Sequence, residues 1–123
     1  MKLHTMINQV DEDGKPHGHW ERYFADGSLC SKGEYKNGLE HGAWKYYRKS
    51  GNLKWEFNYK KGILCGFQKA YYHDGRLSFK RGYQNNIRCG LWEDYSEEGL
   101  LFYKGGYKNE KQIGLWYEDR FND

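Results

Sequence analysis

The chain is poor in proline, in cysteine and in aliphatic residues. Pro16 is the only proline, there are three cysteines, and hydrophobic residues make up 37% of the 123 positions. With a mean hydropathy of −1.12, a conventional two-layer core of aliphatic side chains is not expected. Three cysteines cannot all pair within one chain, so we predict free thiols in a reducing compartment.

Long apolar runs and a field of one charge sign are also missing. The chain has no stretch of about 18 apolar residues that could span a membrane, and residues 1–10 lack the apolar segment of a signal peptide. Its 20 basic and 17 acidic residues are scattered, for a net charge of +3. Such a distribution steers polyanions weakly, so no nucleic-acid partner is expected. We therefore predict a soluble, cytoplasmic protein.

Aromatic residues and glycine are abundant instead. Twelve Tyr, six Phe and five Trp raise the aromatic content to 19%, and there are 16 Gly. Each large ring buries roughly 150–250 Å² when it packs. A thin sheet that buries rings between long polar side chains fits this composition.

Glycine recurs every 24 residues, and other residues keep the same register. The recurring positions are Gly18, Gly42, Gly66, Gly90 and Gly114; Trp20, Trp44, Trp92 and Trp116; Tyr23, Tyr47, Tyr71 and Tyr95. Leu29 and Tyr35 begin two further columns, and only Gln68 breaks the tryptophan column. We predict one domain with an N-terminal cap or partial repeat (1–17), full repeats (18–41, 42–65, 66–89, 90–113) and a truncated repeat or cap (114–123).

Each repeat carries two turn sequences, such as Asp26-Gly27 and Asn37-Gly38, that tolerate positive φ. Short turns between aromatic-rich segments predict an all-β protein: an elongated, single-layer antiparallel meander of stacked β-hairpins. We expect roughly eight to ten strands of about five to seven residues, and no helix.

Period-2 alternation predicts which residues share a face of the sheet. Four residues of the first repeat are expected on the better-buried face: Leu29, Ser31, Gly33 and Tyr35. Trp20 and Tyr23 are three residues apart, so they point to opposite faces unless a bulge intervenes.

The pattern G-x-W-x-x-Y-x-x-x-G-x-L-x-x-x-x-x-Y-x-x-G resembles the bacterial variant of the MORN repeat, over roughly residues 14–118. This resemblance implies stacked hairpins that form a protein-binding scaffold, sometimes with a lipid contact, and no catalysis. Some bacterial relatives are labelled antitoxin components. The sequence departs from the pattern at Gln68, Asn86 and Glu110. Glu tolerates positive φ poorly, so a reshaped turn is expected at Glu110.

One column invites a metal or redox interpretation, because the residues before the repeat glycines are His17, His41, Cys65, Cys89 and Ile113. Equivalent positions of successive hairpins lie two strands apart, roughly 9–10 Å, which is too far for a disulfide or a zinc site. His17 and His19 form a pair without a third ligand in register. Nucleophile, base and phosphate-loop motifs are absent, so we predict no catalytic residue, no metal and no cofactor.

The candidate binding residues are aromatic. Trp55, Phe79 and Tyr103 share a column with Ser31, and we expect them to form a stripe that Tyr46 and Tyr72 extend from neighbouring strands. Such rings are enriched at protein interfaces. The alternative is that they only cover their neighbours. An exposed edge strand could also pair with a second copy to give a homodimer.

Protein binding is the leading function, with toxin neutralisation as one form of it. A carbohydrate-binding module is an alternative, because aromatic hairpin repeats also build such modules. Binding to anionic lipid or single-stranded nucleic acid is another, with basic pairs such as Lys60-Lys61 beside the rings. Contact with a membrane is therefore a less favoured prediction.

Overall fold

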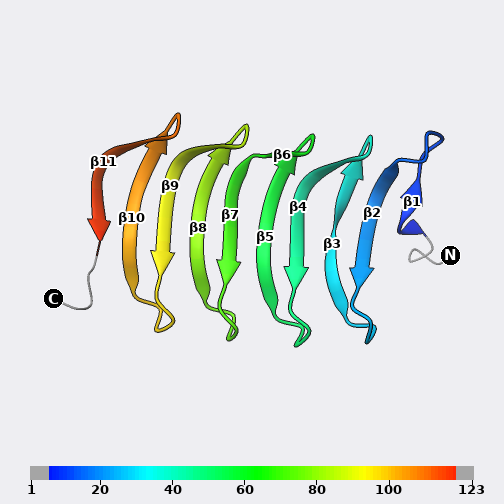
Figure 1. Cartoon of the computed structure of the whole chain (residues 1–123), viewed down its shortest axis with the longest axis horizontal. Coiled ribbons are helices and arrows are strands. Elements are labelled where there is room, and N and C mark those ends of the chain that lie inside the picture. The colour runs from blue at the N-terminus through cyan, green and yellow to red at the C-terminus, as the bar shows by residue number, and fades with distance from the viewer. Residues whose placement is uncertain (1–5, 119–123) are drawn as a thin grey trace.

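The structure is a computed structural model that describes the backbone of residues 6–118 and the side chains of residues 6–114. Eleven strands form one open antiparallel sheet, in which strands pair in chain order except that β6 and β7 both pair with β5 (Figure 1). The strands are β1 (Gln9–Val10), β2 (Pro16–Tyr23), β3 (Leu29–Lys36), β4 (Leu39–Tyr47), β5 (Leu53–Lys60), β6 (Ile63–Leu64), β7 (Gly66–Tyr71), β8 (Leu77–Gln84), β9 (Ile87–Tyr95), β10 (Leu101–Lys108) and β11 (Lys111–Glu118).

The predicted single-layer, all-β meander is confirmed, and the described residues contain no helix that could cross a bilayer. Two numerical expectations were wrong. There are eleven strands, and most have eight or nine residues; β2, β4, β9 and β11 are long because they continue through the repeat glycine. Gly42 and Gly90, for example, lie within β4 and β9 with φ of 82° and 74°. A positive φ bends the strand there, and glycine accepts it without a steric penalty.

Two kinds of turn alternate along the chain, and each kind lies at its own long edge of the sheet (Figure 1). The turns that join one hairpin to the next have positive φ at both central residues, as Asn37 (54°) and Gly38 (80°) between β3 and β4 do, which is the geometry of tight turns. The turns within the hairpins, such as that between β2 and β3, are longer. In the first of these, Phe24 N donates to Ser28 O at 2.8 Å and Gly27 has a φ of 91°.

The turn at Glu110 is not reshaped, so that expectation was wrong. Asn109 and Glu110 have φ of 51° and 71°, like the equivalent turn residues elsewhere. The Glu110 carboxylate accepts hydrogen bonds from Arg88 N at 2.6 Å and Arg88 Nε at 3.2 Å. Asn86 makes the equivalent contact one repeat earlier, since its Oδ1 accepts from Leu64 N at 2.8 Å. These contacts between neighbouring turns offset the backbone strain of a non-glycine residue.

A bulge in every hairpin moves the leucine column to the other face. In the first hairpin Arg22 pairs with Ser31 and Tyr23 with Leu29, so Cys30 is an extra residue in β3. The same shift recurs in the other hairpins. Leu29 therefore shares a face with Tyr23, and the prediction that it shares the face of Ser31 was wrong. Trp20 and Tyr23 lie on opposite faces, because β2 itself is regular there.

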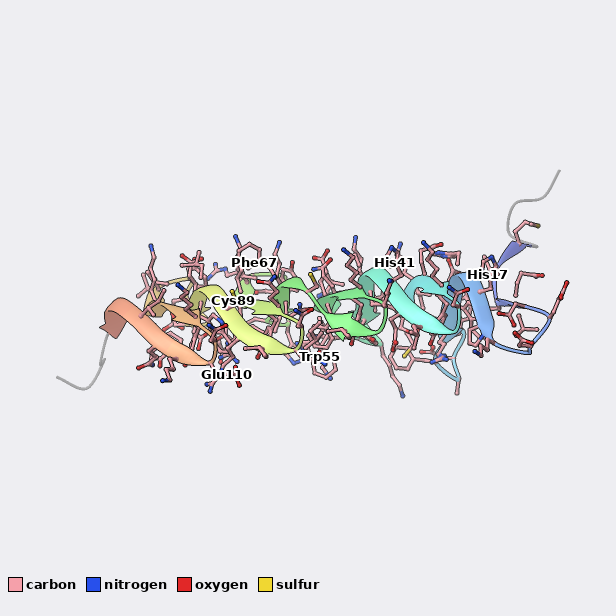
Figure 2. All side chains as sticks on the ribbon, turned by 90° about the horizontal axis from the view of Figure 1, so that it is seen from above. His17, His41, Trp55, Phe67, Cys89 and Glu110 are labelled. Carbon is pink, nitrogen blue, oxygen red and sulfur yellow. The ribbon has the colours of Figure 1, made fainter. Side chains whose placement is uncertain are left out.

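The two faces of the sheet differ in chemistry. We call the face that carries the tryptophan column the aromatic face, and it holds the buried residues Ser31, Trp44, Gln68, Ala70, Trp92 and Tyr107. The other, charged face carries one row of paired residues across eight strands: Glu21, Lys32, Lys45, Glu56, Lys69, Lys80, Glu93 and Lys104. In the edge-on view of Figure 2, Trp55 of the aromatic face and Phe67 of the charged face lie on opposite sides of the ribbon.

The described indoles of the tryptophan column, those of Trp20, Trp44 and Trp92, each donate to the backbone of the preceding strand. Trp44 Nε1 donates to Glu34 O at 3.0 Å, and Trp92 Nε1 donates to Gly82 O at 2.9 Å. The Trp44 ring lies over Gly33, where an added Cβ would come within 2.2 Å of a ring atom. These bonds and ring contacts give a single layer the burial that a second layer normally provides.

Candidate binding surface

One row of residues crosses the aromatic face near the bulged end of the strands. Cross-strand pairing places its members side by side in the order Ser31, Tyr46, Trp55, Ala70, Phe79, Asp94 and Tyr103. We call its four rings, Tyr46, Trp55, Phe79 and Tyr103, the aromatic row. The predicted stripe therefore exists as a spatial arrangement, although Ala70 and Asp94 interrupt it.

Trp55 is the most prominent member of the row. Its side chain is 38% exposed, yet it is held from two sides. The Phe57 ring stacks at a centroid distance of 5.8 Å with a 14° angle, and Lys54 Nζ lies 4.2 Å from the Trp55 ring centroid. An exposed indole that is already ordered loses little conformational entropy when a partner binds it.

Tyr46 joins Trp55 to the buried part of the face. Its ring lies 6.2 Å from that of Trp55 and 5.6 Å from that of Phe57. Burial raises the pKa of the Tyr46 hydroxyl well above its ordinary value, with a further contribution from Tyr59. The phenol is therefore neutral and able to donate a hydrogen bond over the physiological pH range.

Phe79 is supported by an ion pair that the sequence analysis missed. Arg81 binds Asp94 in a two-pronged geometry, with Nε to Oδ1 at 3.1 Å and Nη2 to Oδ2 at 2.8 Å. The guanidinium carbon also lies 4.0 Å from the Phe79 ring centroid. The only sequence signal was an irregular column, in which Arg81 takes the place of Gly33 and Phe57.

Two predicted residues occupy the margins of this surface. Tyr103 in β10 pairs with Asp94 and accepts a hydrogen bond from Gln112 Nε2 at 3.4 Å. Tyr72 does not belong to the row. It follows the last residue of β7, and its hydroxyl donates to Tyr95 O at 2.6 Å. We correct its placement: Tyr72 ties a turn to the next repeat.

The structural columns divide between the two faces as the pairing requires. Gly18, Trp20, Gly42, Trp44, Gly66, Gly90 and Trp92 lie on the aromatic face, whereas Tyr23, Tyr47, Tyr71 and Tyr95 lie on the charged face. Gly114 has a φ of 70°, like the other repeat glycines. The Trp116 side chain lies outside the described part of the chain.

No group of three or more potential metal ligands occurs among the described residues. Cys30, Cys65 and Cys89 are unpaired. His19 is held instead by two carboxylates, with Nε2 2.9 Å from Glu21 and Nδ1 2.8 Å from Glu34. The Glu21 hydrogen bond is the largest influence on the pKa of His19, which is raised above its ordinary value. This cluster fits an ion-pair network that ties β2 to β3.

The fold and the surface define an open, single-layer β-hairpin repeat protein with two exposed faces. Part of the chain is similar to a known repeat family. The model described as MORN repeat variant matches residues 16–37 and 40–61. These segments contain the hairpins β2–β3 and β4–β5. Repeats of this kind commonly form binding or scaffold modules and are generally not enzymes. No curated protein matched the chain in a comparison of sequences.

Proposed function

We propose that this chain is a non-enzymatic protein-binding module that presents its aromatic row to a partner protein. The observation that carries the proposal is Trp55, an exposed indole held between Phe57 and Lys54. Ordered aromatic anchors are typical of interface hot spots, where truncation commonly costs roughly 2 kcal/mol or more.

The surroundings of the row favour a protein over a purely apolar ligand. Arg81 and Asp94 lie beside Phe79, and their side chains retain 30% and 15% exposure. A ring cluster with hydrogen-bonding groups at its border matches the organisation of protein interfaces, in which an apolar centre has a polar rim. The opposite face carries a row of five Lys and three Glu, which water solvates well.

The first experiment is an affinity capture from the native lysate, followed by a binding measurement with the recombinant partner. The test variant is Trp55→Ala/Phe79→Ala/Tyr103→Ala. The matched control is Ile63→Ala/Phe67→Ala/Ile87→Ala, which removes apolar side chains of similar exposure from the charged face. We expect the row variant to weaken affinity by at least about thirtyfold, the equivalent of roughly 2 kcal/mol, and the control to bind as wild type does.

The comparison requires both variants to be folded, which far-UV and near-UV circular dichroism will establish. Equal affinity of wild type and the folded row variant would contradict the proposal and assign the row to packing. If glycans or anionic vesicles bind while no protein does, the carbohydrate or lipid alternative replaces it.

Two finer proposals depend on that partner. If it is a toxin, adding this chain at a stoichiometric ratio will abolish the toxic activity, and the row variant will fail to do so. Homodimerisation through an edge strand is a separate proposal. Sedimentation velocity over a range of concentrations tests it, and a single monomeric species throughout would contradict it.

A further inference from the structure

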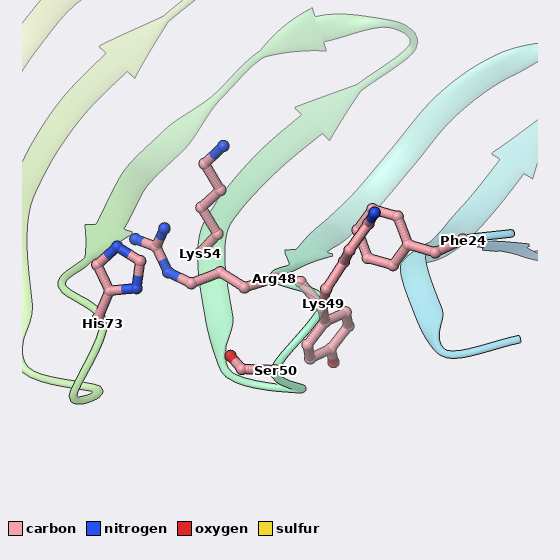
Figure 3. A pocket seen from close by; sticks show the side chains of 7 residues that line it. Phe24, Arg48, Lys49, Ser50, Lys54 and His73 are labelled. Atoms are coloured by element: carbon pink, nitrogen blue, oxygen red, sulfur yellow. The ribbon is translucent and has the colours of Figure 1, made fainter. Parts of the chain in front are cut away.

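A basic recess lies at the edge of the sheet formed by the longer turns. It has a volume of about 390 Å³, within the roughly 300–1,000 Å³ range of small-molecule sites. Its lining comes from three consecutive turns of this edge and from β4 and β5, as Figure 3 shows. The lining residues are Phe24, Tyr47, Arg48, Lys49, Ser50, Lys54 and His73.

The charge of this recess differs from that of the rest of the same edge. Arg48, Lys49, Lys54 and His73 line it, and no carboxylate does. The equivalent turns of the other repeats each carry acidic residues, namely Asp26, Asp74, and Glu97 with Glu98. The turn at residues 48–52 is thus the one basic turn of the four, and the recess lies where a positive potential is concentrated.

The Arg48 side chain is held in place by a hydrogen bond, but not all of its N–H donors have a partner in the described part of the chain. Its Nη2 donates to Tyr71 O at 2.9 Å, which holds the side chain across the neighbouring strand. Its Nε is buried and has no hydrogen-bond partner among the described residues. A guanidinium has five N–H donors, and an unsatisfied buried donor costs free energy. An anion that approached this guanidinium would supply the acceptors that the protein does not.

The neighbouring turn is also fixed relative to Arg48. Asn52 Nδ2 donates to His73 O at 2.5 Å, which joins the second and third turns. In Figure 3 the His73 ring lies beside the Arg48 guanidinium, whereas the Lys54 side chain starts from the adjacent strand and its ammonium is directed away from the guanidinium. Arg48 and His73 therefore lie together in the recess, and Lys54 adds a positive charge to its lining.

The remaining walls are aromatic. Phe24 and Tyr47 line the recess on the side of Lys49, whose Nζ lies 5.9 Å from the Phe24 ring centroid. Combined with the basic group, these walls fit a ligand that has an anionic head and a flat apolar stem. Arg pairs with phosphate through parallel hydrogen bonds, which makes a phosphate the best-matched head.

We propose that the recess binds a phosphate monoester with an aromatic stem, the phosphate against Arg48 and His73 with Lys54 contributing positive charge to the lining, and the stem on the side of Phe24 and Tyr47. The site is distinct from the aromatic row and does not depend on the proposed protein-binding function. Lys54 connects the two regions, because its ammonium lies over the Trp55 ring.

The test measures binding of phenyl phosphate to the full chain by NMR titration and calorimetry. We expect saturable binding, with amide shifts confined to residues 48–52 and the region of His73. The variant Arg48→Gln/Lys54→Gln should weaken it at least tenfold. The matched control is Lys60→Gln/Lys61→Gln, which removes the same charge from the other end of the β5 hairpin and should leave the affinity unchanged.

Three further probes separate the elements of the proposal. Inorganic phosphate should bind more weakly than phenyl phosphate, and phenol should not bind. Equal loss in both variants, or no saturable binding, would overturn the site. If inorganic phosphate binds as tightly as phenyl phosphate, the aromatic stem contributes nothing to affinity, and that part of the proposal is overturned. If the protein binds phosphatidic acid vesicles but not phenyl phosphate, the ligand is a lipid headgroup, and the proposal of a soluble phosphate monoester is overturned.

Discussion

The repeat that contains Gln68 differs from its neighbours at the strand level. β4 and β9, which carry Trp44 and Trp92, are continuous nine-residue strands. The equivalent stretch of the Gln68 repeat is divided into β6 and β7, with Cys65 between them. Two residue pairs join β5 to β6 and two join it to β7, whereas five pairs join β3 to the continuous β4. The loss of one indole therefore coincides with a local break in the ladder.

The hydrogen bond to the preceding strand nevertheless persists in both kinds of repeat. Gln68 Nε2 donates to Asn58 O at 3.3 Å, the position equivalent to the acceptor of Trp44, and its Oε1 accepts from Asn58 N at 2.7 Å. Gln68 is 2% exposed, as deeply buried as Trp44 at 3%. The feature shared by Trp44, Gln68 and Trp92 is thus a buried donor aimed at the carbonyl ten residues upstream, and the indole is one way to supply it; Trp20 donates instead to Gln9 O, eleven residues upstream.

The two kinds of repeat differ in the space that is available for an indole. Trp44 lies over Gly33, and the residue equivalent to Gly33 in the next unit is Phe57. A second large ring beside Phe57 would overfill this site, whereas a linear amide fits. We infer that Phe57 and Gln68 share one volume, as Gly33 and Trp44 do. In the Trp92 repeat the equivalent residue is Arg81, whose guanidinium carbon lies 5.0 Å from the Trp92 ring centroid.

The largest expected effect is that of Trp44→Ala. Removal of a buried indole leaves a cavity and an unpaired Glu34 carbonyl, so we expect a loss of about 3–5 kcal/mol in the free energy of unfolding. Urea denaturation followed by circular dichroism measures it. Gln68→Ala should cost less, because it removes a smaller volume. Equal losses in the two variants would contradict a packing role specific to the indole.

An exchange of residues tests the shared volume directly. Gln68→Trp alone should destabilise the protein by about 1–3 kcal/mol through overpacking against Phe57. In the background of Phe57→Gly the same substitution should be tolerated or stabilising. A double-mutant cycle measures the coupling, expected at about 0.5–3 kcal/mol. Additive effects would show that the two positions are independent.

A smaller effect is expected at Glu110, which, like Gln68, departs from the repeat pattern and makes a contact with a neighbouring repeat. Its hydrogen bonds with Arg88, that with the backbone N–H first, lower the pKa of Glu110. A lowered folded-state pKa means that stabilisation is present above the ordinary value of 4.5 and is lost as the pH falls through the folded value. Melting temperatures from pH 7 to pH 3 should show this loss in wild type. They should show less of it in Glu110→Gln, and identical profiles would refute the contact.

The smallest expected effect concerns His19, which lies in β2, in a hairpin that has the usual tryptophan of the repeat. Its pKa is raised, so its stabilisation is complete below the ordinary value of 6.5 and is lost as the pH rises through the folded value. Amide hydrogen exchange should therefore become faster in β2–β3 relative to β7–β8 as the pH passes that value, after correction for intrinsic rates. His19→Gln should abolish this difference, and its persistence in the variant would exclude His19 as the cause.

Much of the architecture followed from the 24-residue period, because short turns at fixed spacing leave an antiparallel meander as the simplest arrangement. The face of Leu29 could not be predicted, since the bulge at Cys30 is visible only in the cross-strand register. The Glu110 turn depends on Arg88, 22 residues away, which intrinsic turn preferences do not take into account. For the binding surface, periodicity found Trp55, Phe79 and Tyr103, whereas Tyr72 needed the turn geometry to be placed correctly.

The open meander has a mechanical consequence. In Figure 1 the strands run across the long axis of the sheet, so the hydrogen bonds between strands lie along that axis. A force that pulls β1 and β11 apart would load these bonds one strand at a time, because no second layer shares the load. The molecule should then lengthen stepwise at low force, strand by strand, which would let it act as a compliant spacer between whatever is attached to its two ends.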